Sequence, residues 1–191
     1  MRGTIDFYDG DPEGYSAKTF HADVSPIRDR FLNHVPDGGR ILDLGCGSGR
    51  DTLFFRDMGY VPVPVDGSEG MRAVAERNTG IPVRRLQFSE LDYDGEFDAV
   101  WACSTLLHVP SAELPGVLAK VRKALRTGGV LFMSFKRGDF EGVREGRHYT
   151  DMTEARLDAL CEECGFERLE TWCSQEPGRD IPWCNTIVRR T

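Results

Sequence analysis

Short apolar runs alternate with helix-like stretches along most of this 191-residue chain. Such alternation is typical of a parallel sheet covered by helices on both faces, because each parallel strand must be followed by a crossover connection. We therefore predict an α/β fold with a doubly wound, mostly parallel sheet. The strands are expected at residues 40–44, 60–65, 83–88, 97–102 and 130–135, and the helices between them at 50–58, 68–78 and 111–125.

One of these expected strands is irregular. The run at 60–65 contains Pro62 and Pro64, which cannot donate hydrogen bonds to a neighbouring strand. Prolines normally restrict such a run to the edge of a sheet or argue against a strand. We keep the strand because it completes the first strand, helix and strand unit.

The N-terminal part is expected to carry one helix ahead of the first strand. Ser25 can cap free backbone N–H groups and Pro26 suits the first helical position, so this helix should run from Ser25 to Leu32. We predict two parts, an N-terminal cap segment with this helix at 1–36 and a single globular domain at 37–191. A hydrophobic content of 40% over 191 residues is enough for one such core.

The C-terminal part is expected to end in antiparallel strands. Strand-like runs at 166–173 and 184–190 are separated by the turn-rich residues 176–180, which predicts an antiparallel pair. A helix at 153–164 precedes them. The polar, glycine-bearing residues 136–150 predict a loop that faces the substrate.

Composition argues against several classes of protein. No apolar stretch approaches the roughly 18 residues of a membrane span, and the first ten residues lack the layout of a secretory signal, so we expect a cytoplasmic protein. The net charge of −7 opposes the basic field that attracts a phosphate backbone. A nucleic-acid partner is therefore disfavoured, and a small-molecule substrate is expected.

The six cysteines are expected to be free thiols, because they are irregularly spaced in a chain without a secretory signal. Cys161 and Cys164 form a C-x-x-C pair that could indicate metal or redox chemistry. The pair lies within a helical pattern and has no second Cys or His pair nearby. We interpret both as ordinary helix positions and expect no metal site.

A glycine-rich loop links the first strand to its helix. Gly45, Gly47 and Gly49 let the backbone approach a ligand where a side chain would obstruct it. Asp66 ends the next strand, seventeen positions after Gly49. A carboxylate at that point of a doubly wound sheet can accept hydrogen bonds from both hydroxyls of an adenosine ribose. The loop therefore predicts an adenosine-containing cofactor.

A dinucleotide such as NAD is the competing ligand, because its sites use the same strand, loop, helix and acidic residue. Its fingerprint requires a third small residue at the sixth position, where helix and strand pack closely. Arg50 occupies that position here. The spacing therefore disfavours an NAD-dependent oxidoreductase.

Taken together, these residues resemble the motifs of the class I S-adenosylmethionine-dependent methyltransferases, which have a Rossmann-like fold. The segment ILDLGCGSG at 41–49 resembles the family's first motif, and DGSEGM at 66–71 its second. FDAV at 97–100 and LLHV at 106–109 resemble the fourth strand and the stretch after it. LRTGGVL at 125–131 resembles the turn before the fifth strand, with Thr127 in place of a proline.

The resemblance implies S-adenosylmethionine as cofactor and S-adenosylhomocysteine as product. The glycine loop would surround the methionine part, Asp43 would approach its amino group through water, and Asp66 would bind the ribose, as carboxylates suit such donors. The residues beside adenine would include Met71, whose thioether is polarizable. The implied residues of these motifs are Asp43, Gly45, Cys46, Gly47, Gly49, Asp66, Gly67, Ser68 and Met71.

Other parts of the cofactor site are less regular. Tyr15 lies in a segment similar to one that covers the cofactor in several small-molecule methyltransferases, and Ala102 and Cys103 are expected near the sulfonium. Many relatives carry an aspartate for the adenine amino group at the end of the third strand. This chain lacks it, and the expected substitutes are Ser89, Glu90 and Leu91.

Methyl transfer needs mainly alignment of donor and acceptor, so a general base is optional. His108 and Arg147 are the catalytic candidates, although an ordinary histidine at a helix start is the preferred interpretation of His108. The stretches WACSTLLHVP at 101–110 and SFK at 134–136 resemble tellurite-resistance-type methyltransferases, which implies a small oxyanion acceptor. A non-catalytic regulator that binds S-adenosylmethionine remains an alternative.

Overall fold

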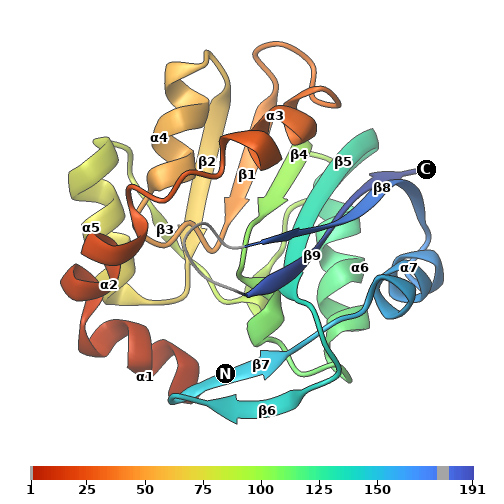
Figure 1. Ribbon diagram of the computed structural model, residues 1–191. Helices are drawn as coiled ribbons and strands as arrows, with labels where there is room; N and C mark the ends of the chain where they lie inside the picture. The colour runs from red at the N-terminus through yellow and green to blue at the C-terminus, as the bar shows by residue number, and fades with distance from the viewer. Residues whose placement is uncertain (1, 176–180) are drawn as a thin grey trace.

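The computed structural model describes residues 2–175 and 181–191 (Figure 1). Its main sheet has the strand order β3-β2-β1-β4-β5-β9-β8. The first five of these strands are parallel, and β9 and β8 are antiparallel additions at one edge. The strands are β1 (Arg40–Leu44), β2 (Val61–Asp66), β3 (Arg84–Arg85), β4 (Phe97–Ala102), β5 (Leu125–Lys136), β8 (Phe166–Gln175) and β9 (Pro182–Arg190).

Helices cover both faces of this sheet. On one face, Phe31 of α3 and Phe55 of α4 pack against Trp101 of β4. On the other face, Leu118 of α6 and Leu157 of α7 belong to a larger apolar core. The helices of these layers are α3 (Ser25–Leu32), α4 (Arg50–Asp57), α5 (Glu69–Thr79), α6 (Leu114–Ala124) and α7 (Glu154–Glu163). The predicted α/β class, doubly wound sheet and antiparallel C-terminal strands are confirmed.

The proline-containing strand forms because both prolines face away from β1. The N–H of Val61 donates to Gly39, and the carbonyl of Val65 accepts from Gly45, so the odd-numbered residues face β1. The backbone nitrogens of Pro62 and Pro64, which carry no hydrogen, therefore lie on the side of β3. Strand β3 pairs only with the last two residues of β2. No ladder hydrogen bond is lost at either proline.

Several element boundaries differ from the predictions. The strand expected at 83–88 is reduced to β3, because the chain turns into the short 3-10 helix η1 (Phe88–Glu90). Helix α6 begins three residues later than expected, and β5 begins at Leu125 rather than at 130. The turn expected at 176–180 lies outside the described residues.

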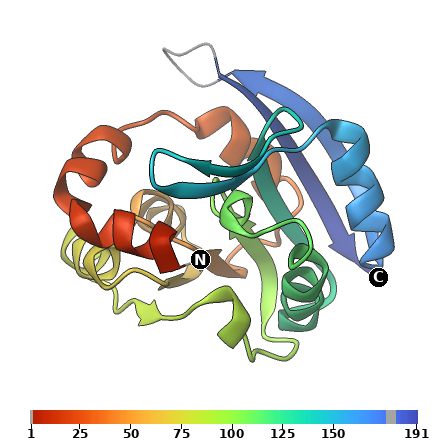
Figure 2. The same cartoon turned by 90° about the horizontal axis from the view of Figure 1, so that it is seen from below.

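The largest differences are at the end of the sheet that carries the glycine loop. The expected loop at 136–150 contains a hairpin of β6 (Glu141–Arg144) and β7 (Arg147–Thr150). The first twenty residues contain α1 (Arg2–Gly10) and α2 (Pro12–Thr19), which the sequence analysis did not predict. Figure 2 shows α1, α2 and this hairpin around the same end of the molecule.

None of the helices in the described part of the chain is long and apolar enough to span a membrane. Cys161 is buried in α7, and Cys164 is the C-cap residue of this helix. Cys161 therefore occupies an ordinary helix position, as interpreted from the sequence, whereas Cys164 lies one residue beyond the helix.

Candidate cofactor and substrate cavity

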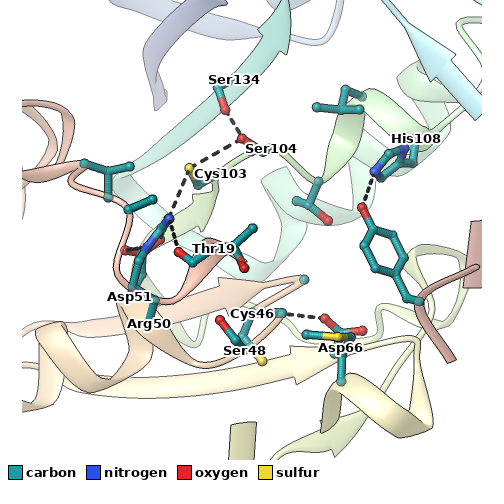
Figure 3. A pocket seen from close by; sticks show the side chains of 18 of the residues that line it. Thr19, Cys46, Ser48, Arg50, Asp51, Asp66, Cys103, Ser104, His108 and Ser134 are labelled. Atoms are coloured by element: carbon teal, nitrogen blue, oxygen red, sulfur yellow. Dashed lines mark hydrogen bonds and ion pairs between the residues drawn. The ribbon is translucent and has the colours of Figure 1, made fainter. Parts of the chain in front are cut away.

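A cavity of about 610 Å³ lies where the parallel strands end and the glycine loop begins (Figure 3). Its floor comes from the residues that follow β1, β2 and β4, together with the end of β5. Tyr8 of α1 and Tyr15 of α2 line it from the N-terminal side, and Arg147 and Tyr149 of β7 line it from the hairpin. The carboxyl ends of parallel strands are the usual place for a ligand in such a sheet.

The glycine loop begins directly after β1, and its first position requires glycine. Gly45 has a φ of 73°, and a Cβ there would lie 2.0 Å from the Thr105 hydroxyl. Gly47, with a φ of 56°, lines the cavity, and a Cβ there would meet nothing within 4 Å. Gly49 caps α4, where a Cβ would lie 2.7 Å from the side chain of Thr79. Gly45 thus allows the turn, Gly47 leaves room for a ligand, and Gly49 allows α4 to pack closely against α5.

Asp66 holds this loop and faces the cavity. Its carboxylate accepts hydrogen bonds from the backbone N–H of Gly47 and of Ser68, both at 2.9 Å. Burial raises the pKa of Asp66 to about 6. Because two N–H groups use only part of the capacity of a carboxylate, its remaining lone pairs can accept from a bound ligand.

Asp43 lies deeper in the loop and is 2% exposed. Its carboxylate accepts from the Thr52 hydroxyl at 2.5 Å. Burial, followed by the negative charge of Asp51, raises its pKa to about 7. A cation or ammonium donor bound nearby would favour its ionised form.

Arg50 and Asp51 form a further part of the wall that sequence reasoning missed. Arg50 donates to Asp51 from Nε at 3.0 Å and from a terminal nitrogen at 2.7 Å. The indole N–H of Trp101 donates to the same carboxylate at 2.9 Å. The available signal in the sequence is the adjacent opposite charges of Arg50 and Asp51.

Comparison with known proteins shows what this chain is similar to. Residues 41–129 match the sequence model of a methyltransferase domain. A ubiquinone biosynthesis O-methyltransferase from Methylococcus capsulatus is 35% identical over 133 residues, which are 65% of this chain and 54% of that protein. From β1 to the start of β5 the chain thus resembles the domain of the class I S-adenosylmethionine-dependent methyltransferases. It spans about half the length of the curated relatives that it matches first.

Solved methyltransferase structures share this fold. The structure of Burkholderia thailandensis 1,6-didemethyltoxoflavin-N1-methyltransferase, which contains 1,6-didemethyltoxoflavin and S-adenosylhomocysteine, has a TM-score of 0.80 and 24% identity, covering 98% of this chain and 85% of its own. An S-adenosylmethionine-dependent methyltransferase from Methanosarcina mazei has a TM-score of 0.75 and 20% identity, covering 84% and 96%. The predicted Rossmann-like methyltransferase fold is thereby confirmed.

The cavity brings together most of the residues that the motifs implied. Those that line it are Tyr15, Asp43, Gly45, Cys46, Gly47, Asp66, Gly67, Ser68, Met71 and Cys103. Their predicted contacts with the cofactor remain predictions. The catalytic candidates His108 and Arg147 also line the cavity.

The other implied residues do not line the cavity. Ala102 and Leu91 belong to the apolar core, and Gly49 packs against α5. Glu90 accepts the N–H of Gln87 and so caps its own turn, while its neighbour Ser89 is exposed. The wall is formed instead by Leu86, Gln87 and Phe88. The shift arises because β3 ends at Arg85, three residues before the expected end of the strand.

His108 is held on both ring nitrogens. Its Nδ1 lies 2.7 Å from the carbonyl of His148, which can only accept, so Nδ1 carries the proton. The neutral Nε2 then accepts from the Tyr8 hydroxyl at 2.9 Å. Burial lowers the pKa of His108 to about 4. This arrangement fits a structural link between α1 and the hairpin better than a general base.

Arg147 brings positive charge to the hairpin side of the cavity. Its guanidinium lies over the rings of Phe7, at 4.3 Å, and Tyr149, at 5.3 Å. It pairs at 3.2 Å with Glu145, whose side chain is 84% exposed, and its Nε is buried without a partner among the described residues. The ammonium of Lys136 lies 4.5 Å from the Tyr149 ring. The cavity therefore has an acidic cofactor end and a cationic, aromatic end.

Proposed function

We propose that this chain transfers the methyl group of S-adenosylmethionine to a small, anionic molecule. The observation that carries this proposal is the single cavity that joins the glycine loop and Asp66 to the cationic end around Arg147. The relatives' names support the methyltransferase reaction, and the charge of the lining supports the nature of the acceptor.

The glycine-loop end suits the methyl donor. The lone pairs of Asp66 would accept from the ribose hydroxyls, and Asp43 would attract the ammonium group through water. Met71, which is 1% exposed, would pack beside adenine. Tyr15 and Cys103 also line the cavity, and the aromatic face of Tyr15 would suit a sulfonium.

The hairpin end suits the acceptor. Arg147 combines a positive charge with an Nε–H that no described residue accepts, so an oxyanion there would gain a charge-assisted hydrogen bond. The aromatic rings of Tyr149 and Trp183 line the same end and would limit the acceptor to a small molecule. The likeness of residues 101–110 to tellurite-resistance-type methyltransferases is a reason to include inorganic oxyanions among the candidates.

The reaction itself requires little proton chemistry. The bond between sulfur and the methyl carbon breaks while the acceptor atom bonds to that carbon, and sulfur keeps the electron pair as S-adenosylhomocysteine. Alignment of the two reactants in one cavity supplies most of the acceleration. His108, neutral and hydrogen-bonded on both nitrogens, is not assigned a step.

Two measurements test this proposal. Calorimetry should show saturable binding of S-adenosylmethionine and S-adenosylhomocysteine and no binding of NAD at the same concentrations. S-adenosylhomocysteine formation is then followed with a panel of small carboxylates, phenolates and inorganic oxyanions, tellurite included. Cofactor binding without turnover of any acceptor would favour a non-catalytic regulator that binds S-adenosylmethionine. Tight NAD binding without S-adenosylmethionine binding would overturn the proposal.

A further inference from the structure

Four polar side chains line the cavity in neighbouring positions across the sheet. Ser104 follows β4, Ser134 lies in β5, Asn185 in β9 and Ser174 in β8, which are consecutive strands of the sheet. Ser134 and Asn185 are directly opposite each other. We call these four residues the polar strip; Figure 3 shows Ser104 and Ser134 beside Cys103.

The orientation of the Asn185 amide is determined by its neighbours. Its Nδ2 donates to the carbonyl of Trp172 at 3.4 Å and to the hydroxyl of Ser174 at 3.0 Å. Since a carbonyl can only accept, the amide nitrogen must face Trp172. The side chain is 0% exposed, and no donor in the described part of the chain reaches its Oδ1. A buried carbonyl oxygen without a donor is costly and calls for a partner.

Ser104 is the second unusual residue of the strip. Its φ of 54° lies in the left-handed region, which a non-glycine residue adopts at a cost. Its N–H donates to the Ser134 hydroxyl at 2.8 Å, which holds the strained backbone in place. Strained residues of this kind cluster at ligand sites. Ser104 and Ser134 thus form one hydrogen-bonded pair of the strip and Asn185 and Ser174 the other, and all four residues line the same cavity.

We propose that Asn185 Oδ1 binds an O–H or N–H group of the methyl acceptor and so determines which acceptors are used. This inference rests on the proposed function and extends it to a substrate class. The acceptor would be a small anion that also carries a hydroxyl or N–H group, with its charge toward Arg147. A molecule without such a hydrogen would leave the buried Oδ1 unpaired and would be rejected.

The hydrogen bond has a defined place in the reaction. When an O–H or N–H group is methylated, its heavy atom bonds to the methyl carbon and its proton is released to water. A neutral amide cannot take that proton, so Asn185 orients the group and does not act as a base. It is therefore a specificity-determining residue, which a comparison of paired ligands can test.

The test uses protein saturated with S-adenosylhomocysteine and two pairs of probes. One pair is 4-hydroxybenzoate and 4-methoxybenzoate, and the neutral pair is phenol and anisole; dissociation constants are measured by ligand-observed NMR titration. The wild-type chain should bind the hydroxyl member at least tenfold more tightly in one pair or both. Asn185→Leu should reduce this preference to within twofold, and Asn185→Asp, which keeps an accepting oxygen, should retain it.

Thr186→Val is the matched control. Thr186 is also 0% exposed on β9, but its hydroxyl donates to the carbonyl of Glu170 and it does not line the cavity. This variant should keep the wild-type preference. Equal binding within both pairs, no binding of any probe, or an unchanged preference in Asn185→Leu would overturn the inference.

The proposed function is judged separately, by calorimetry with S-adenosylhomocysteine on the same samples. Absence of binding to the wild-type chain would refute the cofactor site, not the role of Asn185. The wild-type comparison of hydroxyl and methoxy probes needs no substitution, so it remains decisive even where Asn185→Leu lowers Tm.

Discussion

Asp66 shows how one side chain can serve both the fold and a ligand. It accepts the N–H groups of Gly47 and Ser68, and these bonds hold the glycine loop around the cavity. The same carboxylate lines the cavity where the ribose is expected. Substitution of Asp66 should therefore remove ligand contacts and also loosen the glycine loop.

We expect Asp66→Ala to weaken S-adenosylmethionine binding at least tenfold, since two hydrogen bonds of roughly 1 kcal/mol or more each would be lost. Calorimetry on both proteins measures the change. Asp57→Ala is the control, because Asp57 is exposed at the end of α4 and pairs with Arg56. An affinity equal to that of the wild type would remove Asp66 from the ribose site.

Asp43 makes the stability of the ligand-free protein depend on pH. Its pKa in the fold is about 7, above the ordinary value of 3.8, so between these values the folded state holds a proton that the unfolded state has lost. Unfolding releases that proton, and the free energy of unfolding falls as pH rises through this range. Above about pH 8 Asp43 is ionised in both states and the effect levels off.

Asp43→Asn removes this dependence. Relative to the variant, the wild-type chain should lose about 1 kcal/mol of stability per pH unit between pH 5 and pH 7, and almost none above about pH 8. Urea unfolding at several pH values measures the difference, and Asp66 contributes equally to both proteins. Parallel pH profiles for the two chains would show that Asp43 is ionised throughout this range.

At the scale of elements, the hairpin and α1 depend on each other. The Tyr8 hydroxyl bonds to His108, and the hydroxyl of Thr4 accepts the N–H of His148 at 3.0 Å. The hairpin was missed in the sequence because its two-residue turn is Glu145-Gly146, both with positive φ, where asparagine or aspartate normally precedes the glycine. The two helices before residue 20 were missed because their packing surface is supplied by distant segments.

Tyr8→Phe should loosen this link. The loss of one hydrogen bond to a buried imidazole should cost about 1 kcal/mol in unfolding free energy and speed amide exchange across α1. Urea unfolding and hydrogen exchange measure the two effects. Tyr60→Phe is the control, because the Tyr60 hydroxyl makes no hydrogen bond within the described residues. Unchanged exchange in α1 would show that other contacts hold the helix.

At the scale of the whole molecule, cofactor binding should stabilise the fold by mass action. S-adenosylhomocysteine at a hundredfold excess over its Kd should add about 2.7 kcal/mol, which raises Tm by roughly 5–10 °C in a chain of this length. Thermal unfolding with and without the ligand measures the shift, with NAD at the same concentration as the control. An equal shift with NAD would contradict the discrimination assigned to Arg50.

The amino-acid sequence by itself determined the parallel sheet, the glycine loop and the resemblance to methyltransferases, because these depend on local patterns of apolar residues, glycines and strand-end carboxylates. It predicted Ser89, Glu90 and Leu91 in the cavity wall, three residues later than the lining residues Leu86, Gln87 and Phe88, because the end of a short strand depends on its partners. Only the tertiary structure decided the acceptor end, which brings together α1, β7 and β9 from distant parts of the chain. Contacts between such distant segments leave no periodic or motif signal. Arg147 was therefore predicted as a catalytic candidate without its neighbours in the fold, and the unpartnered oxygen of Asn185 was not predicted at all.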